Sequence, residues 1–111
     1  QVYDVAVIDE AAQATEPSCW LALLQTKKVV LAGDHHQLAP TVKSSAAKGR
    51  LGYTLFERLT DTARDQVFML KQQYRMNEII MNWASQEFYN NQLQAHERVA
   101  HHTLCGLPNV E

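Results

Sequence analysis

The sequence predicts an α/β fold with a parallel sheet and flanking helices, and three observations support this prediction. Two short apolar runs, residues 5–8 (VAVI) and 29–32 (VVLA), have the composition of strands buried on both faces of a parallel sheet. The chain between them is long enough for the helical crossover that joins parallel strands in the right-handed sense. With 46% apolar and 20% charged residues, the 111-residue chain has the composition of about one small globular domain.

The elements of the first half follow from local signals. A strand is expected over residues 3–8, where the first apolar run lies. A helix is expected to begin near residues 15–18, because Pro17 is tolerated in a first helical turn and apolar residues follow at helical spacing. The second strand is expected over residues 29–32, between Lys27-Lys28 and Gly33.

The second half is less regular. Residues 40–52 are rich in Ser, Ala, Gly and Lys and are interpreted as a loop, followed by a helix over 53–59. Residues 67–70 (VFML) are a third candidate strand, and residues 77–89 are predicted to form a helix capped by Asn77. The last twenty residues are ambiguous. Four large aromatic residues are expected in the core: Trp20, Phe56, Trp83 and Phe88.

Composition also restricts the class of protein. The formal charge of −2 provides no overall electrostatic attraction to nucleic acid, so such binding requires a local patch or parts of the protein outside this chain. No apolar run is long enough to span a bilayer and no secretory signal opens the chain, so we expect no membrane partner and an intracellular protein of the cytoplasm or nucleus. Cys19 and Cys105 form no CxxC pair, which favours reduced thiols. We expect a piece of a larger protein, because the chain starts with Gln1 and ends without a clear closing element.

Acidic residues follow both predicted strands of the first half. Asp9 and Glu10 end the first strand, and Gly33-Asp34 ends the second. The carboxyl ends of parallel strands meet at one edge of a sheet, where ligands bind, so these acids should share that edge. Asp9 is suited to holding Mg²⁺, and Glu10 to orienting and deprotonating a water that attacks a terminal phosphate. The alternative is that an Asp-Glu pair simply ends a strand and faces solvent, which is the better interpretation for an isolated pair.

Three sequence blocks occur in a fixed order: residues 7–13 (VIDEAAQ), 33–40 (GDHHQLAP) and 72–76 (QQYRM). Together they resemble motifs II, III and IV of superfamily 1 helicases. The DEAAQ, GDxxQLxP and QYRM forms are most similar to the branch that contains the nonsense-mediated-decay and immunoglobulin mu-binding helicases. Residues 18–20 and 84–93 are most similar to the immunoglobulin mu-binding group.

The resemblance implies a P-loop NTPase with two RecA-like domains that clamp ATP and Mg²⁺ and step along single-stranded DNA or RNA, generally 5′ to 3′. It also implies roles in ATP binding and hydrolysis for seven residues: Mg²⁺ binding by Asp9, general-base catalysis by Glu10, sensing of the γ-phosphate or its attacking water by Gln13 and Gln37, support of the loop between them by Asp34, γ-phosphate contact from the second domain by Arg75, and adenine stacking by Tyr74. An arginine supplied across an interface contributes roughly 10³ to 10⁵ in rate, and would make hydrolysis depend on domain closure.

The same resemblance divides the chain into residues 1–71, the last part of the first RecA-like domain, and 72–111, the start of the second. No GxxxxGK[ST] phosphate-binding loop occurs, so we expect this segment alone neither to hydrolyse ATP nor to unwind a duplex. A basic set in the 40–52 segment is a candidate contact for strand phosphates: Lys43, Lys48 and Arg50. A solvated loop with scattered cations is at least as good an interpretation.

Two other functions stay open at this point. One is a nucleic-acid-binding homologue that has lost its motor, and the other is a P-loop ATPase that does not act on nucleic acid. The presence of Asp9, Glu10 and Arg75 together favours an active motor, because a dead homologue has no chemical need for all three. The sequence predicts no oligomeric state.

Overall fold

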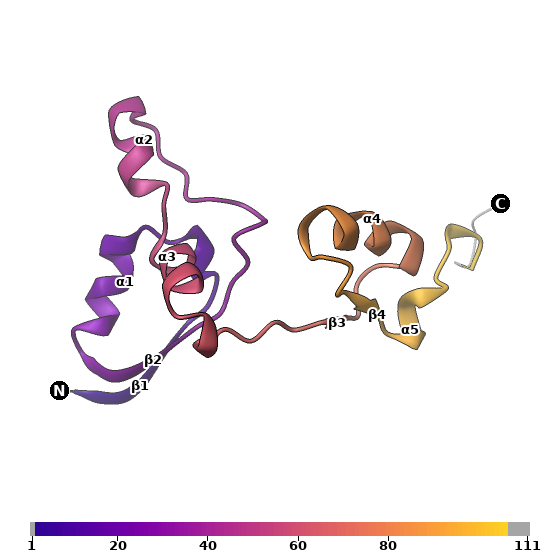
Figure 1. Cartoon of the computed structure of the whole chain (residues 1–111), viewed down its shortest axis with the longest axis horizontal. Coiled ribbons are helices and arrows are strands. Elements are labelled where there is room, and N and C mark those ends of the chain that lie inside the picture. The colour runs from indigo at the N-terminus through magenta and orange to yellow at the C-terminus, as the bar shows by residue number, and fades with distance from the viewer. Residues whose placement is uncertain (1, 107–111) are drawn as a thin grey trace. The chain divides into compact units, whose positions relative to one another are not determined.

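The computed structural model describes residues 2–106 of the chain. The chain divides into two compact units, Gln1–Val67 and Phe68–Glu111 (Figure 1). The predicted domain ranges, 1–71 and 72–111, include Gln1 and residues 107–111, which lie outside the described residues. The limits of these domains stay a prediction, because a compact unit is not by itself an independently folding domain.

The first unit contains the two strands predicted from the apolar runs. β1 (Tyr3–Ile8) and β2 (Thr26–Leu31) pair in parallel, with Ile8 opposite Leu31. They are joined by α1 (Glu16–Leu23), which packs against both strands (Figure 1). The predicted parallel pairing and helical crossover are therefore confirmed.

α3 (Leu55–Thr62) completes the small core of this unit. Its first turn is capped by the Thr54 hydroxyl, which accepts a hydrogen bond from the Glu57 N–H at 3.1 Å. The helix packs against a short 3₁₀ turn, Ala11–Gln13, that follows β1. The buried residues of the unit are few and mostly small: Ala11, Ala12, Cys19, Thr54 and Leu55. The turn that follows Asp9 and Glu10 is therefore held against the core of this unit.

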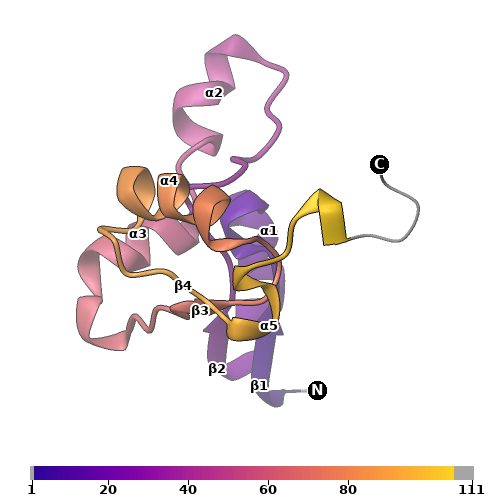
Figure 2. The same cartoon turned by 90° about the vertical axis from the view of Figure 1, so that its right-hand side faces the viewer.

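The interpretation of residues 40–52 as a loop is wrong for most of that segment. Helix α2 (Ser45–Leu51) occupies it and stands away from the strands of its unit in both Figure 1 and Figure 2. Ala, Lys, Arg and Leu are strong helix formers, and they outweigh the single Gly49 within the helix. The Gly-Ser-Lys composition that indicated a loop was thus less informative than the intrinsic helix propensity of its neighbours.

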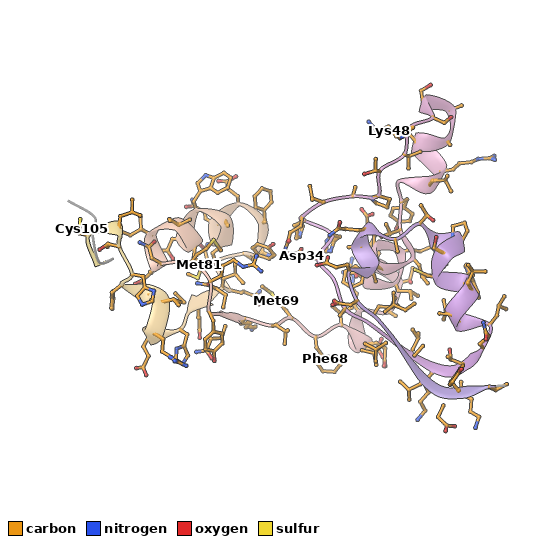
Figure 3. The ribbon with its side chains drawn as sticks, turned by 180° about the vertical axis from the view of Figure 1, so that it is seen from behind. Asp34, Lys48, Phe68, Met69, Met81 and Cys105 are labelled. Atoms are coloured by element: carbon orange, nitrogen blue, oxygen red, sulfur yellow. The ribbon has the colours of Figure 1, made fainter. Side chains whose placement is uncertain are left out.

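The third predicted strand, residues 67–70, is also wrong. The segment is irregular and all four side chains are exposed, with Leu70 at 90%. A strand is stabilised by a neighbour that pairs with its backbone groups, and apolar composition alone does not supply one. Figure 3 labels Phe68 and Met69 on this irregular segment.

The second unit is organised around α4 (Glu78–Phe88). The Asn77 side chain caps it by accepting a hydrogen bond from the Ile80 N–H at 3.0 Å, as predicted. Two short strands, β3 (Gln72–Gln73) and β4 (Gln94–Ala95), pair in parallel beside this helix.

Both sheets have two strands, consistent with part of a RecA-like domain. The full RecA-like sheet stays a prediction.

Three of the four aromatic residues expected in the core are exposed, Trp20 at 45%, Trp83 at 66% and Phe88 at 43%. One face of the β1–β2 pair is also exposed at Val5 and Val7, although strands of this composition are normally covered on both faces. No helix among residues 2–106 is long and apolar enough to cross a membrane.

Candidate active site

The carboxyl ends of β1 and β2 meet at one edge of the first unit. The Ala32 N–H donates to the carbonyl of Ile8 at 2.9 Å, and the Ala11 N–H donates to the carbonyl of Ala32 at 2.8 Å. These bonds continue the parallel pairing past the last strand residues. The segment with Asp9 and Glu10 therefore leaves the sheet beside the segment that leads to Asp34, as predicted from the sequence.

Gly33 is required for this close approach. A Cβ atom added at Gly33 would lie 2.9 Å from the backbone nitrogen of Ala12 and 3.2 Å from that of Ala11. Both are backbone atoms in a turn that is packed against the core, so neither can easily move aside. The absence of a side chain thus allows the two acid-bearing segments to touch.

Glu10 adopts a left-handed backbone conformation, with φ 52° and ψ 36°. This conformation costs a non-glycine residue about 1–2 kcal/mol. It turns the chain sharply after β1, and the Glu10 N–H donates to Oδ1 of Asp9 at 2.9 Å. Strained conformations of this kind cluster at functional sites. Sequence reasoning found the residue but not its backbone geometry.

Each acid-bearing segment also pairs a carboxylate with a glutamine three residues later. Nε2 of Gln13 donates to Oε2 of Glu10 at 2.8 Å, and Nε2 of Gln37 donates to Oδ2 of Asp34 at 2.8 Å. The Asp34 carboxylate also accepts a hydrogen bond from the His36 N–H at 3.0 Å, which shapes the loop after β2. Asp34 is labelled on this loop in Figure 3. The structure therefore couples the predicted acids and glutamines in pairs within each segment.

The donor chemistry at this edge fits Mg²⁺. Asp9 and Glu10 are exposed and present carboxylate oxygens, the ligands that this hard cation prefers. Among residues 2–106 there is no group of three or more His, Cys, Asp or Glu side chains that could hold a metal ion. A pair of carboxylates is enough for this ion, because Mg²⁺ takes one or two of them and completes its shell with waters and substrate phosphates.

Tyr74 and Arg75 lie in the second unit, in the turn after β3, and both are exposed. The Tyr74 hydroxyl donates to Oε1 of Gln72 at 3.0 Å. Its ring stacks on the imidazole of His96, with centroids 4.4 Å apart and planes inclined by 26°. The joint action of these residues with the acids of the first unit stays a prediction.

Sequence reasoning missed a hollow next to Tyr74. It has a volume of about 280 Å³ and is also lined by Arg98, Val99 and His102. These residues belong to or follow the short helix α5 (Glu97–Ala100), in the part of the sequence that seemed ambiguous. Its four residues are too few to show a helical period, so the sequence carried no usable signal.

The three cations that are candidates for binding a nucleic-acid strand are exposed, and two of them lie on a helix. Lys48 and Arg50 occupy the last turn of α2, and Lys43 precedes the helix. Figure 3 labels Lys48 on this helix. Their predicted contact with strand phosphates is untested by the fold.

Sequence reasoning also missed a contact that joins α1 to α3. The Arg58 guanidinium forms an ion pair with the Glu16 carboxylate, and the indole N–H of Trp20 donates to the same carboxylate at 3.1 Å. The hydrogen bond from Arg58, followed by that from Trp20, holds the pKa of the Glu16 carboxyl below its usual range. The pair fixes α3 against α1 at a sequence separation that no local pattern reveals.

Comparison with known sequences extends these observations. Two family matches, each described as an AAA domain, cover residues 1–45 and 51–110. The first range contains the acid-bearing segments, and the second contains Tyr74 and Arg75.

The chain is similar over nearly its whole length to several curated proteins. It is 50% identical over 110 residues to the DNA-binding protein SMUBP-2 of Rattus norvegicus, a match that covers 97% of this chain and 11% of that protein. It is 47% identical over 109 residues to an uncharacterized ATP-dependent helicase of Methanocaldococcus jannaschii, covering 98% of this chain and 16% of that protein. It is 43% identical over 102 residues to the ATP-dependent helicase upf1 of Schizosaccharomyces pombe, covering 86% of this chain and 11% of that protein.

Proposed function

Since the chain belongs to the AAA-domain family, we propose that it is part of an ATP-dependent helicase that couples ATP hydrolysis to movement along single-stranded DNA or RNA. The resemblance of the three motif blocks to superfamily 1 helicases is confirmed by the named helicases among its relatives. The chain spans between 11% and 18% of the length of the curated relatives it matches, so the activity is that of a longer protein.

One observation carries the proposal. The parallel pairing of β1 and β2 brings the Asp9–Glu10 turn and the loop of Asp34 to the same edge of the sheet. An antiparallel pair would put these acids at opposite ends and would leave the motif resemblance without a site. Ligands of parallel α/β sheets bind at this edge.

Within this site Asp9 holds Mg²⁺, which when bound neutralises charge on the ATP phosphates. Glu10 is the general base that orients and deprotonates the attacking water, and its exposed carboxylate is steadied by the hydrogen bond from Gln13. Gln37, held by Asp34, senses the γ-phosphate from the second segment. Catalysis of phosphoryl transfer consists mainly of such positioning and charge neutralisation.

Tyr74 and Arg75 complete the site from the second domain when the two domains close around ATP. Arg75 reaches the γ-phosphate and Tyr74 stacks on adenine. Because Arg75 gains its charge partner only in the closed state, ATP binding favours closure and product release favours opening. Repeated closure moves the protein along a nucleic-acid strand, 5′ to 3′ as the motif resemblance implies, inside the cytoplasm or nucleus.

Strand-stimulated ATP turnover by the full-length protein tests the proposal. E10Q should lower turnover by about 100-fold or more while ATP binding is retained, because the amide cannot accept the proton. E87Q, on the exposed surface of α4, is the matched control and should leave turnover unchanged. Full turnover in E10Q would remove Glu10 from the general-base role. Turnover that no strand stimulates would favour an ATPase with another target, and absent turnover in the unaltered protein would favour a motor-dead homologue.

A further inference from the structure

A single side chain holds the turn that presents Arg75. Oε1 of Gln73 accepts hydrogen bonds from the N–H groups of Arg75 and Met76, both at 2.8 Å. Nε2 of the same amide donates to the carbonyl of Met76, also at 2.8 Å. Three hydrogen bonds from one half-buried amide therefore hold the backbone of Arg75 and Met76.

The backbone of Gln73 is itself anchored. It pairs with Ala95 in the β3–β4 ladder, and its carbonyl accepts a hydrogen bond from the His96 N–H at 2.9 Å. Because one end of this residue is fixed in the sheet and the other is bonded to the turn, the direction of Arg75 relative to β3 is set through Gln73.

The chemistry of the contact favours glutamine. Two N–H donors converge on one oxygen while a carbonyl acceptor faces the nitrogen, so the site needs an acceptor and a donor on one planar group. Glutamate would keep the two accepted bonds but would place an oxygen against the Met76 carbonyl. Methionine has a similar length and would lose all three bonds.

Tyr74 is supported separately, by its hydroxyl bond to Gln72 and by its stacking on His96. Loss of the Gln73 amide thus removes the direct support of the backbone at Arg75 but leaves these two contacts of the Tyr74 ring in place. The two neighbouring residues can therefore be distinguished in an experiment.

From this geometry we propose that Gln73 is the positioning residue of Arg75: it holds the turn after β3 in the form from which the guanidinium reaches the γ-phosphate. The proposal rests on the function proposed above for Arg75. Misplacement by about 1 Å of a group that stabilises the transition state costs on the order of 100-fold in rate.

The test compares Q73M, Q73E, R75A and the double variant Q73M/R75A in the full-length protein. Q73M should lower kcat of strand-stimulated ATP turnover by about 10- to 100-fold and change KM for ATP by less than about threefold, because Arg75 acts mainly in the transition state. Q73E, which keeps two of the three bonds, should lie between Q73M and the unaltered protein. In the R75A background, Q73M should have less than about a threefold effect, since Gln73 acts through Arg75. Q86M, at an exposed glutamine of α4, is the matched control.

Amide hydrogen exchange gives a readout that does not depend on activity. The N–H groups of Arg75 and Met76 should exchange faster in Q73M than in the unaltered protein, because their acceptor is lost. Unchanged exchange, unchanged kcat or an undiminished effect of Q73M in the R75A background would each overturn the inference. If R75A lowers turnover but Q73M and Q73E do not, only the role of Gln73 fails. If R75A has no effect, the role proposed for Arg75 fails as well.

Discussion

At the scale of single residues, Gly33 sets how closely the two acid-bearing segments approach. G33A would introduce a Cβ atom 2.9 Å from the backbone nitrogen of Ala12, and the segments would have to separate. Overpacking of this kind typically costs about 1–3 kcal/mol of stability. We expect lower strand-stimulated ATP turnover and a lower melting temperature of the full-length protein.

The matched control for this prediction is G49A, because a Cβ atom added at Gly49 meets nothing within 4 Å. Gly49 lies inside helix α2, where alanine is favoured over glycine by up to about 1 kcal/mol, so this change should preserve or raise stability. Equal effects of G33A and G49A on turnover would show that the close approach at Gly33 is unimportant.

Single residues also show how far sequence reasoning reaches. The positions of Asp9, Glu10 and Asp34 followed from apolar runs that end in acids, and the parallel pairing confirms their common edge. The left-handed conformation of Glu10 did not follow, because the sequence at this position carries no glycine to indicate it. The bonds of Gln73 were likewise hidden, since they depend on the conformation of a turn rather than on residue spacing.

At the scale of elements, the Glu16–Arg58 ion pair joins α1 to α3. Because the folded protein lowers the pKa of Glu16, the pair contributes fully above the ordinary carboxyl range and is lost as the pH falls through the lowered value. A double-mutant cycle with E16Q and R58M should therefore give a coupling in melting temperature of the full-length protein near pH 7 that decreases as the pH falls below the ordinary carboxyl range.

The exposed pair Asp4–Lys27 provides the comparison. Exposed ion pairs contribute little, because solvent screens them and ordering two side chains costs entropy. Its coupling, measured with D4N and K27M, should be the smaller of the two at neutral pH. A coupling for Glu16–Arg58 no larger than this, or one that persists in acid, would contradict a structural role for the pair.

Elements were predicted well where residues adjacent in the sequence determine the structure. They were predicted poorly where packing or pairing with distant segments determines it. The cap of α4 by Asn77 needs only the adjacent turn, and the structure confirms it. The run at residues 67–70 has strand composition but is irregular in the described chain, where no sheet receives it. Helix α2 was missed because the Gly and Ser residues of this segment were given more weight than the helix propensity of its Ala, Lys, Arg and Leu residues.

At the scale of the whole molecule, the described chain leaves much apolar surface exposed. Val5, Val7 and Val30 lie on the uncovered face of the β1–β2 pair, and Trp83 lies on the surface of α4. The sequence predicted these residues as buried because strand composition and aromatic content report the apolar character of a site, not which other segments are present to cover it. Core positions were therefore the least accurate part of the prediction.

Nucleic-acid binding is also a property of the whole protein. Because this chain carries a net charge of −2, attraction must come from a local cluster of cations or from parts of the protein outside this chain. If Lys43, Lys48 and Arg50 contact strand phosphates, replacing all three by Gln should weaken strand binding by the full-length protein. It should also reduce the slope of log K against log salt by about 2, since each phosphate contact to a single strand contributes about 0.7. ATP turnover without a strand should change little, because these side chains lie outside the acid-bearing segments. K28Q, which removes an exposed cation from β2, is the control and should leave the slope of log K against log salt unchanged. An equal loss of binding affinity in both variants would assign the effect to overall charge instead of to this cluster.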